Sequence, residues 1–274
     1  MALPSENRFL DKFFTALEED PHLRDAYFAR FDPHFIPYSP EESRAALLIS
    51  LTFYGGYRMR RRLTLAVPII PNDIVLDIGP EMGTECFILA EVYRKVLVAE
   101  PEYQTAEILR ELAKHYTTDD GHKASDILEI GRAGIIPPGS SKLTNCTDIP
   151  RGPVYYDARG AKDIGDVFGT HFAGRVFLNH LALMMPEEPK LKVLLASLVS
   201  YCSDKGCITW CDSVSELSEI ARAYAMYQGY SIPDSDKCTL KEIERYVEEL
   251  LPDFAVTFRI NRKPHQLITI ARHK

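Results

Sequence analysis

The chain has 274 residues, 46% of them hydrophobic and 26% charged, as in a folded globular protein with one large core or a main domain and a smaller cap. Its formal net charge of −7 argues against a protein whose main task is to bind nucleic acid, because phosphate binding favours a basic surface. A local basic patch remains compatible with this charge, so nucleic acid is disfavoured as a partner without being excluded.

Targeting and redox signals are absent from the sequence. No window holds the ~20 uninterrupted apolar residues of a membrane span, and the first residues lack the pattern of a secretory signal. The six cysteines form no CxxC pair, so neither a metal site nor a disulfide framework is expected. A cytoplasmic protein without a membrane partner is predicted.

The first part of the chain has the pattern of helices. Apolar residues recur at helical spacing after residue 5: Phe9, Phe13, Phe14 and Leu17. Pro21 suits the start of a second helix, and residues 39–57 predict a third, which Gly55 and Gly56 end. Residues 1–70 are therefore predicted to form a helical cap, or lid, over a substrate.

From residue 71 onward, short apolar runs alternate with helical stretches. The expected strands are residues 74–79, 95–100, 153–158, 174–181, 207–212, 253–260 and 265–272. Regular alternation of this kind favours an α/β fold with a doubly wound, mostly parallel sheet over residues 71–274. Only residues 261–264 separate the last two strands, which therefore form an antiparallel hairpin. Residues from about 118 to 152 show weak periodicity and are interpreted as an insertion.

The segment VLDIGPEMG, residues 75–83, marks the first turn from strand to helix. Ligands of a doubly wound sheet bind at the carboxyl ends of the strands, so this turn is the first candidate site. Gly79 and Gly83 allow a tight turn and a close approach of the backbone to a ligand. Glu100 ends the second expected strand, where an acid accepts hydrogen bonds from ribose hydroxyls.

The glycine pattern differs from that of dinucleotide sites. The pattern G-x-G-x-x-G requires a second glycine at position 81, which is Glu81 here. A carboxylate at this position would repel a pyrophosphate. A ligand with adenosine and ribose but with positive charge in place of phosphate fits better, and S-adenosylmethionine is such a ligand.

Residues 74–102 resemble the first motif, D-x-G-x-x-x-G, and the second acidic position of class I S-adenosylmethionine-dependent methyltransferases. The resemblance extends through most of residues 71–274. It implies a Rossmann-like, seven-stranded sheet whose final strand is antiparallel. The segments PVYYDARG, RVFLNHLALMM and DKGCITWCD resemble the third-, fourth- and fifth-strand segments of that family.

The resemblance implies roles for particular residues. Asp77, Gly79 and Gly83 would hold the methionine part of the cofactor, Glu100 the ribose, and Asp157 with Ala158 the adenine. Asn179 and His180 would face the departing methyl group. The predicted cofactor residues are thus Asp77, Gly79, Pro80, Glu81, Gly83, Glu100, Pro101, Asp157, Ala158 and Asn179.

Two departures leave alternatives open. Asp126 competes with Asp157 for the adenine if residues around 126–131 are the third strand. Pro80 and Glu81 alter the glycine loop, which keeps open a cofactor-free scaffold or regulatory subunit with the same fold.

His180 is the candidate catalytic residue. An oxygen or nitrogen nucleophile must lose a proton before or during methyl transfer, and a neutral imidazole can take it. The alternative is that His180 only packs at a strand end. Many methyl transfers need no dedicated base, because proximity and desolvation alone drive them.

Residues 57–62, YRMRRR, contain four arginines. They indicate either a solvated helix end or contact with an anionic acceptor, and Tyr54, Tyr57 and Arg58 are the candidate substrate residues. The sequence predicts a methyltransferase for O- or N-methylation of a small molecule. RNA or protein is the alternative acceptor, and self-association is left open.

Overall fold

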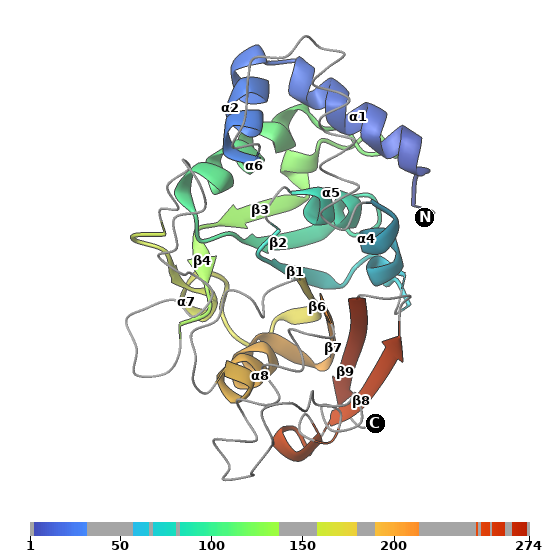
Figure 1. Cartoon of the computed structure of the whole chain (residues 1–274), viewed down its shortest axis with the longest axis vertical. Helices are drawn as coiled ribbons and strands as arrows, with labels where there is room; N and C mark the ends of the chain where they lie inside the picture. Colours follow the sequence, from blue (N-terminus) through green and yellow to red (C-terminus); the bar gives the residue numbers. More distant parts are fainter. Residues whose placement is uncertain are drawn as a thin grey trace, which may run out of the picture. The chain divides into compact units, whose positions relative to one another are not determined.

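The structure is a computed structural model that describes residues 3–31, 57–65, 68–80, 83–136, 158–179, 190–213, 245, 248–252, 254–260 and 265–272. The chain forms two compact units. Unit 1 comprises residues 1–132 and 148–161, and unit 2 comprises residues 133–147 and 162–274. Figure 1 labels their helices and strands.

Unit 1 contains three parallel strands in the order β3-β2-β1 (Figure 1). These are β1 (Ile74–Ile78), β2 (Lys95–Ala99) and β3 (Leu128–Gly131). Helix α5 (Thr84–Ala90) connects β1 to β2, and α6 (Tyr103–His115) with the short η1 (Ala124–Asp126) connects β2 to β3. The last four residues of β1 and of β2 are all buried, as their continuous apolar runs predict for strands covered on both faces.

The third strand differs from the prediction. The sequence places it at residues 153–158 and treats about 118–152 as an insertion, whereas β3 pairs with β2 in parallel at Leu128–Gly131. Residues 153–157 lie outside the described part of the chain. The strand is short, and only Leu128 and Ile130 of its four residues are buried. Such a short alternation gives a weak signal in the sequence.

Helices α1 (Glu6–Glu18), α2 (Pro21–Phe31) and α4 (Tyr57–Thr64) belong to unit 1. The Ser5 side chain caps α1 by accepting a hydrogen bond from the Arg8 amide. Phe13 of α1 meets Phe87 of α5 edge-to-face, with 5.4 Å between the ring centroids. The N-terminal helices therefore share a core with α5 and α6. Their predicted role as a substrate lid, with a boundary at residue 70, stays a prediction.

The expected helix over residues 39–57 lies outside the described residues except for Tyr57. Tyr57 begins α4, so the arginine run is helical.

Charged groups also hold α1 to the rest of unit 1. The buried carboxylate of Glu91, which follows α5, accepts hydrogen bonds from the Tyr116 hydroxyl, the Lys12 ammonium and the Asp119 amide. We call these four residues the Glu91 network. Asp119 also accepts from Lys12 at 2.7 Å and pairs with Arg8 at 3.0 Å.

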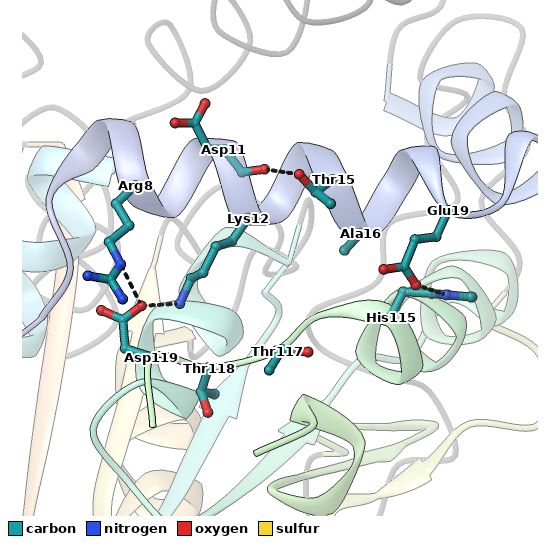
Figure 2. A pocket seen from close by; sticks show the side chains of 10 residues that line it. All are labelled: Arg8, Asp11, Lys12, Thr15, Ala16, Glu19, His115, Thr117, Thr118 and Asp119. Atoms are coloured by element: carbon teal, nitrogen blue, oxygen red, sulfur yellow. Dashed lines mark hydrogen bonds and ion pairs between the residues drawn. The ribbon is translucent and has the colours of Figure 1, made fainter. Parts of the chain in front are cut away.

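A cavity of about 310 Å³ lies between α1 and the chain that follows α6 (Figure 2). Its walls carry Arg8, Lys12 and Asp119 at one end, and His115, which pairs with Glu19 at 2.9 Å, at the other. Because these charged side chains pair with one another, we interpret the cavity as part of the packing interface between α1 and its neighbours and not as a ligand site.

Unit 2 contains the parallel pair β6 (Ala173–Asn179) and β7 (Cys202–Ser213), and the antiparallel strands β9 (His265–Arg272) and β8 (Phe254–Ile260), in the order β6-β7-β9-β8. A second parallel pair, β4 (Ala133–Gly134) and β5 (Lys162–Asp163), precedes α7 (Ile164–Phe168), and α8 (Lys190–Tyr201) leads into β7. Trp210 of β7 is fully buried and pairs with Leu178 and Ile268 on the neighbouring strands.

The chain thus has an α/β fold with parallel strands and N-terminal helices. A single seven-stranded sheet requires the strands of both units to join, and it stays a prediction. Among the described helices, none is both long enough and apolar enough to cross a membrane.

Candidate functional site

The carboxyl ends of β1, β2 and β3 meet at one edge of unit 1. The hydrogen-bond ladder continues past the strands, because the Gly79 amide donates to the Ala99 carbonyl at 3.0 Å and the Glu100 amide to the Gly131 carbonyl at 3.1 Å. This is the edge at which α/β sheets bind their ligands. The structure therefore brings the glycine loop and Glu100 to neighbouring strand ends.

The glycine loop has backbone angles that favour glycine. Gly79 and Gly83 have φ of 68° and 81°, which other L-residues rarely adopt. The Gly83 amide donates to the Pro80 carbonyl at 2.9 Å and closes the turn, and a Cβ atom at Gly83 would lie 2.3 Å from Leu109 Cδ2. Glu81 lies outside the described residues. The turn therefore needs its second glycine to pack against α6.

Asp77, the acid of the motif, is buried at the end of β1. The residue is 1% exposed, and neither of its carboxylate oxygens meets a hydrogen-bond donor in the part of the chain that the structure describes. Burial and the Glu85 carboxylate raise the pKa of Asp77 well above its usual range, and Glu100 adds to this while Arg60 opposes it. Buried polar groups without partners are rare in folded proteins and mark candidate ligand sites.

Two further buried acids and one arginine complete this site. Glu85, in the first turn of α5, is 1% exposed, and Glu100 is 3% exposed. Arg60 reaches from α4 with 6% of its surface exposed, and its Nη1 lies 2.9 Å from Glu85 Oε2. We call Asp77, Glu85 and Glu100 the carboxylate cluster. The carboxylates of Glu85 and Glu100 and the guanidinium of Arg60 all act on the charge of Asp77, which makes this a candidate site for a positively charged ligand group.

The turn after β2 is built by acidic side chains. Glu100 Oε1 accepts from the Glu102 amide at 2.9 Å, and Glu102 caps α6 by accepting from the Gln104 and Thr105 amides. Although burial raises the pKa of Glu102, hydrogen bonds from Thr105 and Gln104 and the charge of Arg30 lower it overall. Pro101, between the two acids, is buried. This turn fixes the direction of the Glu100 side chain.

The other predicted site residues are described only in part. Tyr54, Glu81, Asp157 and His180 lie outside the described residues. Ala158 is half-buried in unit 1, Asn179 ends β6 in unit 2, and Arg58 lies in α4, the last two without described side chains. Their cofactor, catalytic and substrate roles stay predictions.

Tyr57, a predicted substrate residue, packs inside unit 1. It is 2% exposed, its ring lies 5.0 Å from that of Phe9, and its hydroxyl donates to the Pro4 carbonyl. Burial raises the pKa of Tyr57 to about 12. The side chain therefore presents no open surface to a substrate in this structure.

Asp126, the alternative residue for binding the adenine, lies away from the candidate site. Residues 128–131 are the third strand, as that alternative required, but Asp126 lies in η1 at the amino end of β3. The glycine loop and Glu100 lie at the carboxyl ends of the parallel strands. Asp126 is therefore at the wrong edge to meet an adenine beside Glu100.

Sequence reasoning did not single out Arg60 or Glu85. A signal for Arg60 exists in the spacing of α4, because Tyr57, Arg60 and Thr64 follow one another by three and four positions and are all buried. Glu85 looked like an ordinary acid in a first helical turn.

No protein-family model and no curated protein sequence matches the chain. Among solved structures it is similar to magnesium protoporphyrin IX methyltransferase from Synechocystis PCC 6803 with bound SAH, at 9% identity over 91% of this chain and 93% of that chain (TM-score 0.48). It is also similar to the N-methyltransferase NodS from Bradyrhizobium japonicum WM9, at 9% identity over 79% and 85% (TM-score 0.46).

A SAM-dependent methyltransferase from Aquifex aeolicus matches at 12% identity over 94% of this chain and 98% of that chain (TM-score 0.43). With TM-scores below 0.5, these similarities carry no argument about the site, which rests on the residues of this chain. The finding itself is that the fold is similar to those of several solved methyltransferases at low sequence identity.

Proposed function

We propose that the chain is an S-adenosylmethionine-dependent methyltransferase that acts on a small molecule. The observation that carries this proposal is Asp77, a buried carboxylate without a donor among the described residues, beside the glycine loop at the end of β1. A ligand ammonium group would supply the missing hydrogen bonds and the missing positive charge. The amino-acid tail of S-adenosylmethionine carries such a group.

The rest of the site fits the same cofactor. Glu100, which follows β2, would accept hydrogen bonds from ribose hydroxyls, and the backbone at Gly79 and Gly83 would permit close approach of the tail. When bound, the cofactor supplies the methyl group for in-line displacement by an oxygen or nitrogen nucleophile. A pyrophosphate would meet the three acids of the carboxylate cluster and be repelled, which disfavours a nicotinamide dinucleotide.

A small-molecule acceptor is favoured over RNA by the direction of Arg60. This arginine of the basic run turns inward to Glu85, so it adds no charge to an RNA-binding surface. The family resemblance assigns Asn179 and His180 to the methyl-transfer step, with His180 as the acceptor of the nucleophile's proton.

Binding of S-adenosylhomocysteine, measured by titration calorimetry, tests the proposal. Wild-type protein is expected to bind it with micromolar affinity. Glu100→Gln keeps an acceptor for the Glu102 amide but removes the charge that holds the ribose, and it is expected to bind about ten- to hundredfold more weakly. Glu129→Gln, which alters an exposed acid of β3, is the control and leaves affinity unchanged.

Failure of the wild-type protein to bind either S-adenosylmethionine or S-adenosylhomocysteine at millimolar concentration would refute the enzyme. That result would favour the cofactor-free scaffold, with Glu81 as the first residue to examine.

A further inference from the structure

Arg60 is the single described cation that reaches the carboxylate cluster. It lies on the buried face of α4, one turn after Tyr57 and one turn before Thr64. The Thr64 hydroxyl donates to the Arg60 carbonyl at 3.0 Å. Tyr57 anchors the start of the helix by donating to the Pro4 carbonyl. The helix therefore holds the guanidinium in a fixed direction.

The partner of Arg60 belongs to the helix that follows the glycine loop. Glu85 Oε2 receives Arg60 Nη1 at 2.9 Å, and Glu85 stands two residues after Gly83. Both side chains are almost fully buried, so solvent screens their charges little. The pair links the arginine run to the loop that would hold the cofactor tail.

We propose that Arg60 is a positioning residue of the cofactor site, which acts through Glu85 and Asp77 to set how tightly the site holds a cationic ligand. The inference rests on the proposed function, because the cation in question is the ammonium group of the cofactor tail. It deepens that function by giving Arg60 of the arginine run a role in cofactor binding instead of a contact with the methyl acceptor.

The charges around Asp77 determine the direction of the effect. Asp77 faces Glu85 and Cys86 of α5, Arg60 of α4 and Glu100 at the end of β2. Burial raises the pKa of the Cys86 thiol, so this group stays neutral. Glu85 and Glu100 oppose ionisation of Asp77, and Arg60 favours it. A cationic ligand binds the ionised form more tightly, so affinity rises with pH until Asp77 is ionised.

The test is the pH dependence of S-adenosylhomocysteine affinity between about pH 5 and about pH 7.5, where the ligand ammonium stays charged. Four variants are compared with the wild type: Arg60→Gln, Arg60→Lys, Glu85→Gln, and Arg60→Gln combined with Glu85→Gln. 5′-Methylthioadenosine, which lacks the amino-acid tail, is the ligand control and should bind without this pH dependence.

The two single charge removals are expected to act in opposite directions. Arg60→Gln moves the rise in affinity to higher pH by about one to three units, which is at least a tenfold loss at a fixed pH below the midpoint. Glu85→Gln moves the rise in affinity to lower pH. It removes a negative charge that opposes ionisation of Asp77, while the positive charge of Arg60, which favours ionisation, remains. The combined variant falls between them, and Arg60→Lys stays close to the wild type.

Other outcomes overturn the proposal. If Arg60→Gln and Glu85→Gln both weaken binding without moving the pH profile, Arg60 is only a structural bridge between α4 and α5. Circular dichroism checks that each variant is folded, and Glu85→Gln alone decides the sign if Arg60→Gln unfolds. Absence of binding by the wild type at every pH refutes the proposed function itself, whereas wild-type binding with a flat profile leaves cofactor binding standing and refutes both the titration of Asp77 on binding and the role of Arg60.

Discussion

Replacing Asp77 by asparagine is expected to weaken binding of S-adenosylhomocysteine at least thirtyfold, a loss of about 2–5 kcal/mol. Asparagine keeps the shape of the side chain but removes the charge that pairs with the ligand ammonium. Both carboxylate oxygens of Asp77 are buried without hydrogen-bond donors among the described residues, so we expect the ligand ammonium to be their partner. Titration calorimetry with both proteins at neutral pH measures the difference.

The same substitution is expected to leave the free protein as stable or to stabilise it. The pKa of Asp77 is raised by burial above its value in the unfolded chain, so the folded protein binds the proton more tightly. Folding stability from this group is therefore fully present below the unfolded pKa of about 4 and is lost as pH rises toward the folded pKa. The stability advantage of Asp77→Asn should then grow with pH, which thermal unfolding at two pH values measures.

The control for both measurements is Asp126→Asn, which alters an exposed acid at the opposite end of the strands. It should change neither affinity nor its pH dependence. Wild-type affinity in Asp77→Asn would show that the buried acid has no part in ligand binding.

Replacing Glu91 by alanine is expected to lower the free energy of unfolding of unit 1 by about 3–5 kcal/mol. The substitution removes the common acceptor of the Tyr116 hydroxyl, the Lys12 ammonium and the Asp119 amide. The Tyr116 side chain is fully buried, so its hydroxyl has no access to water in exchange. Chemical denaturation followed by fluorescence or circular dichroism gives the change.

Glu91→Gln is the matched variant, because it keeps hydrogen-bonding atoms and removes only the charge. Its loss should be smaller than that of Glu91→Ala. Lys12→Met removes the same ion pair from the side of α1 and leaves the fully buried Glu91 carboxylate without its cation, so it should cost more than Glu91→Gln. A loss below about 1 kcal/mol for Glu91→Ala would contradict a structural role for the Glu91 network.

The strands of unit 1 show what the sequence could predict. Continuous apolar runs placed β1 and β2 correctly, and the aspartate and glycines between β1 and α5 located the turn with positive φ angles. β3 was predicted only as the alternative third strand, because four residues with two buried side chains differ little from a loop in the sequence. The alternation of short apolar runs and helices correctly predicted an α/β fold with parallel strands, whereas the single seven-stranded sheet stays a prediction.

The residues of the candidate site that stand at strand ends could be predicted from the sequence, whereas those that depend on contacts between distant segments could not. Asp77 and Glu100 stand at strand ends that the pattern itself marks. The pairing of Arg60 with Glu85 joins two helices that the sequence does not relate, and an arginine in a basic run is usually solvated. Burial of that pair, and the lack of a hydrogen-bond donor to Asp77 among the described residues, follow only from the three-dimensional packing.

Proton release on ligand binding is the most direct test of a cation site at Asp77. S-adenosylhomocysteine would be titrated at about pH 6.5 in buffers of different ionisation enthalpy, where the ligand ammonium is already charged. We expect binding with release of up to one proton, because the ligand favours ionised Asp77, and loss of that release in Asp77→Asn. Wild-type binding without proton release, or no binding at all, would contradict the account.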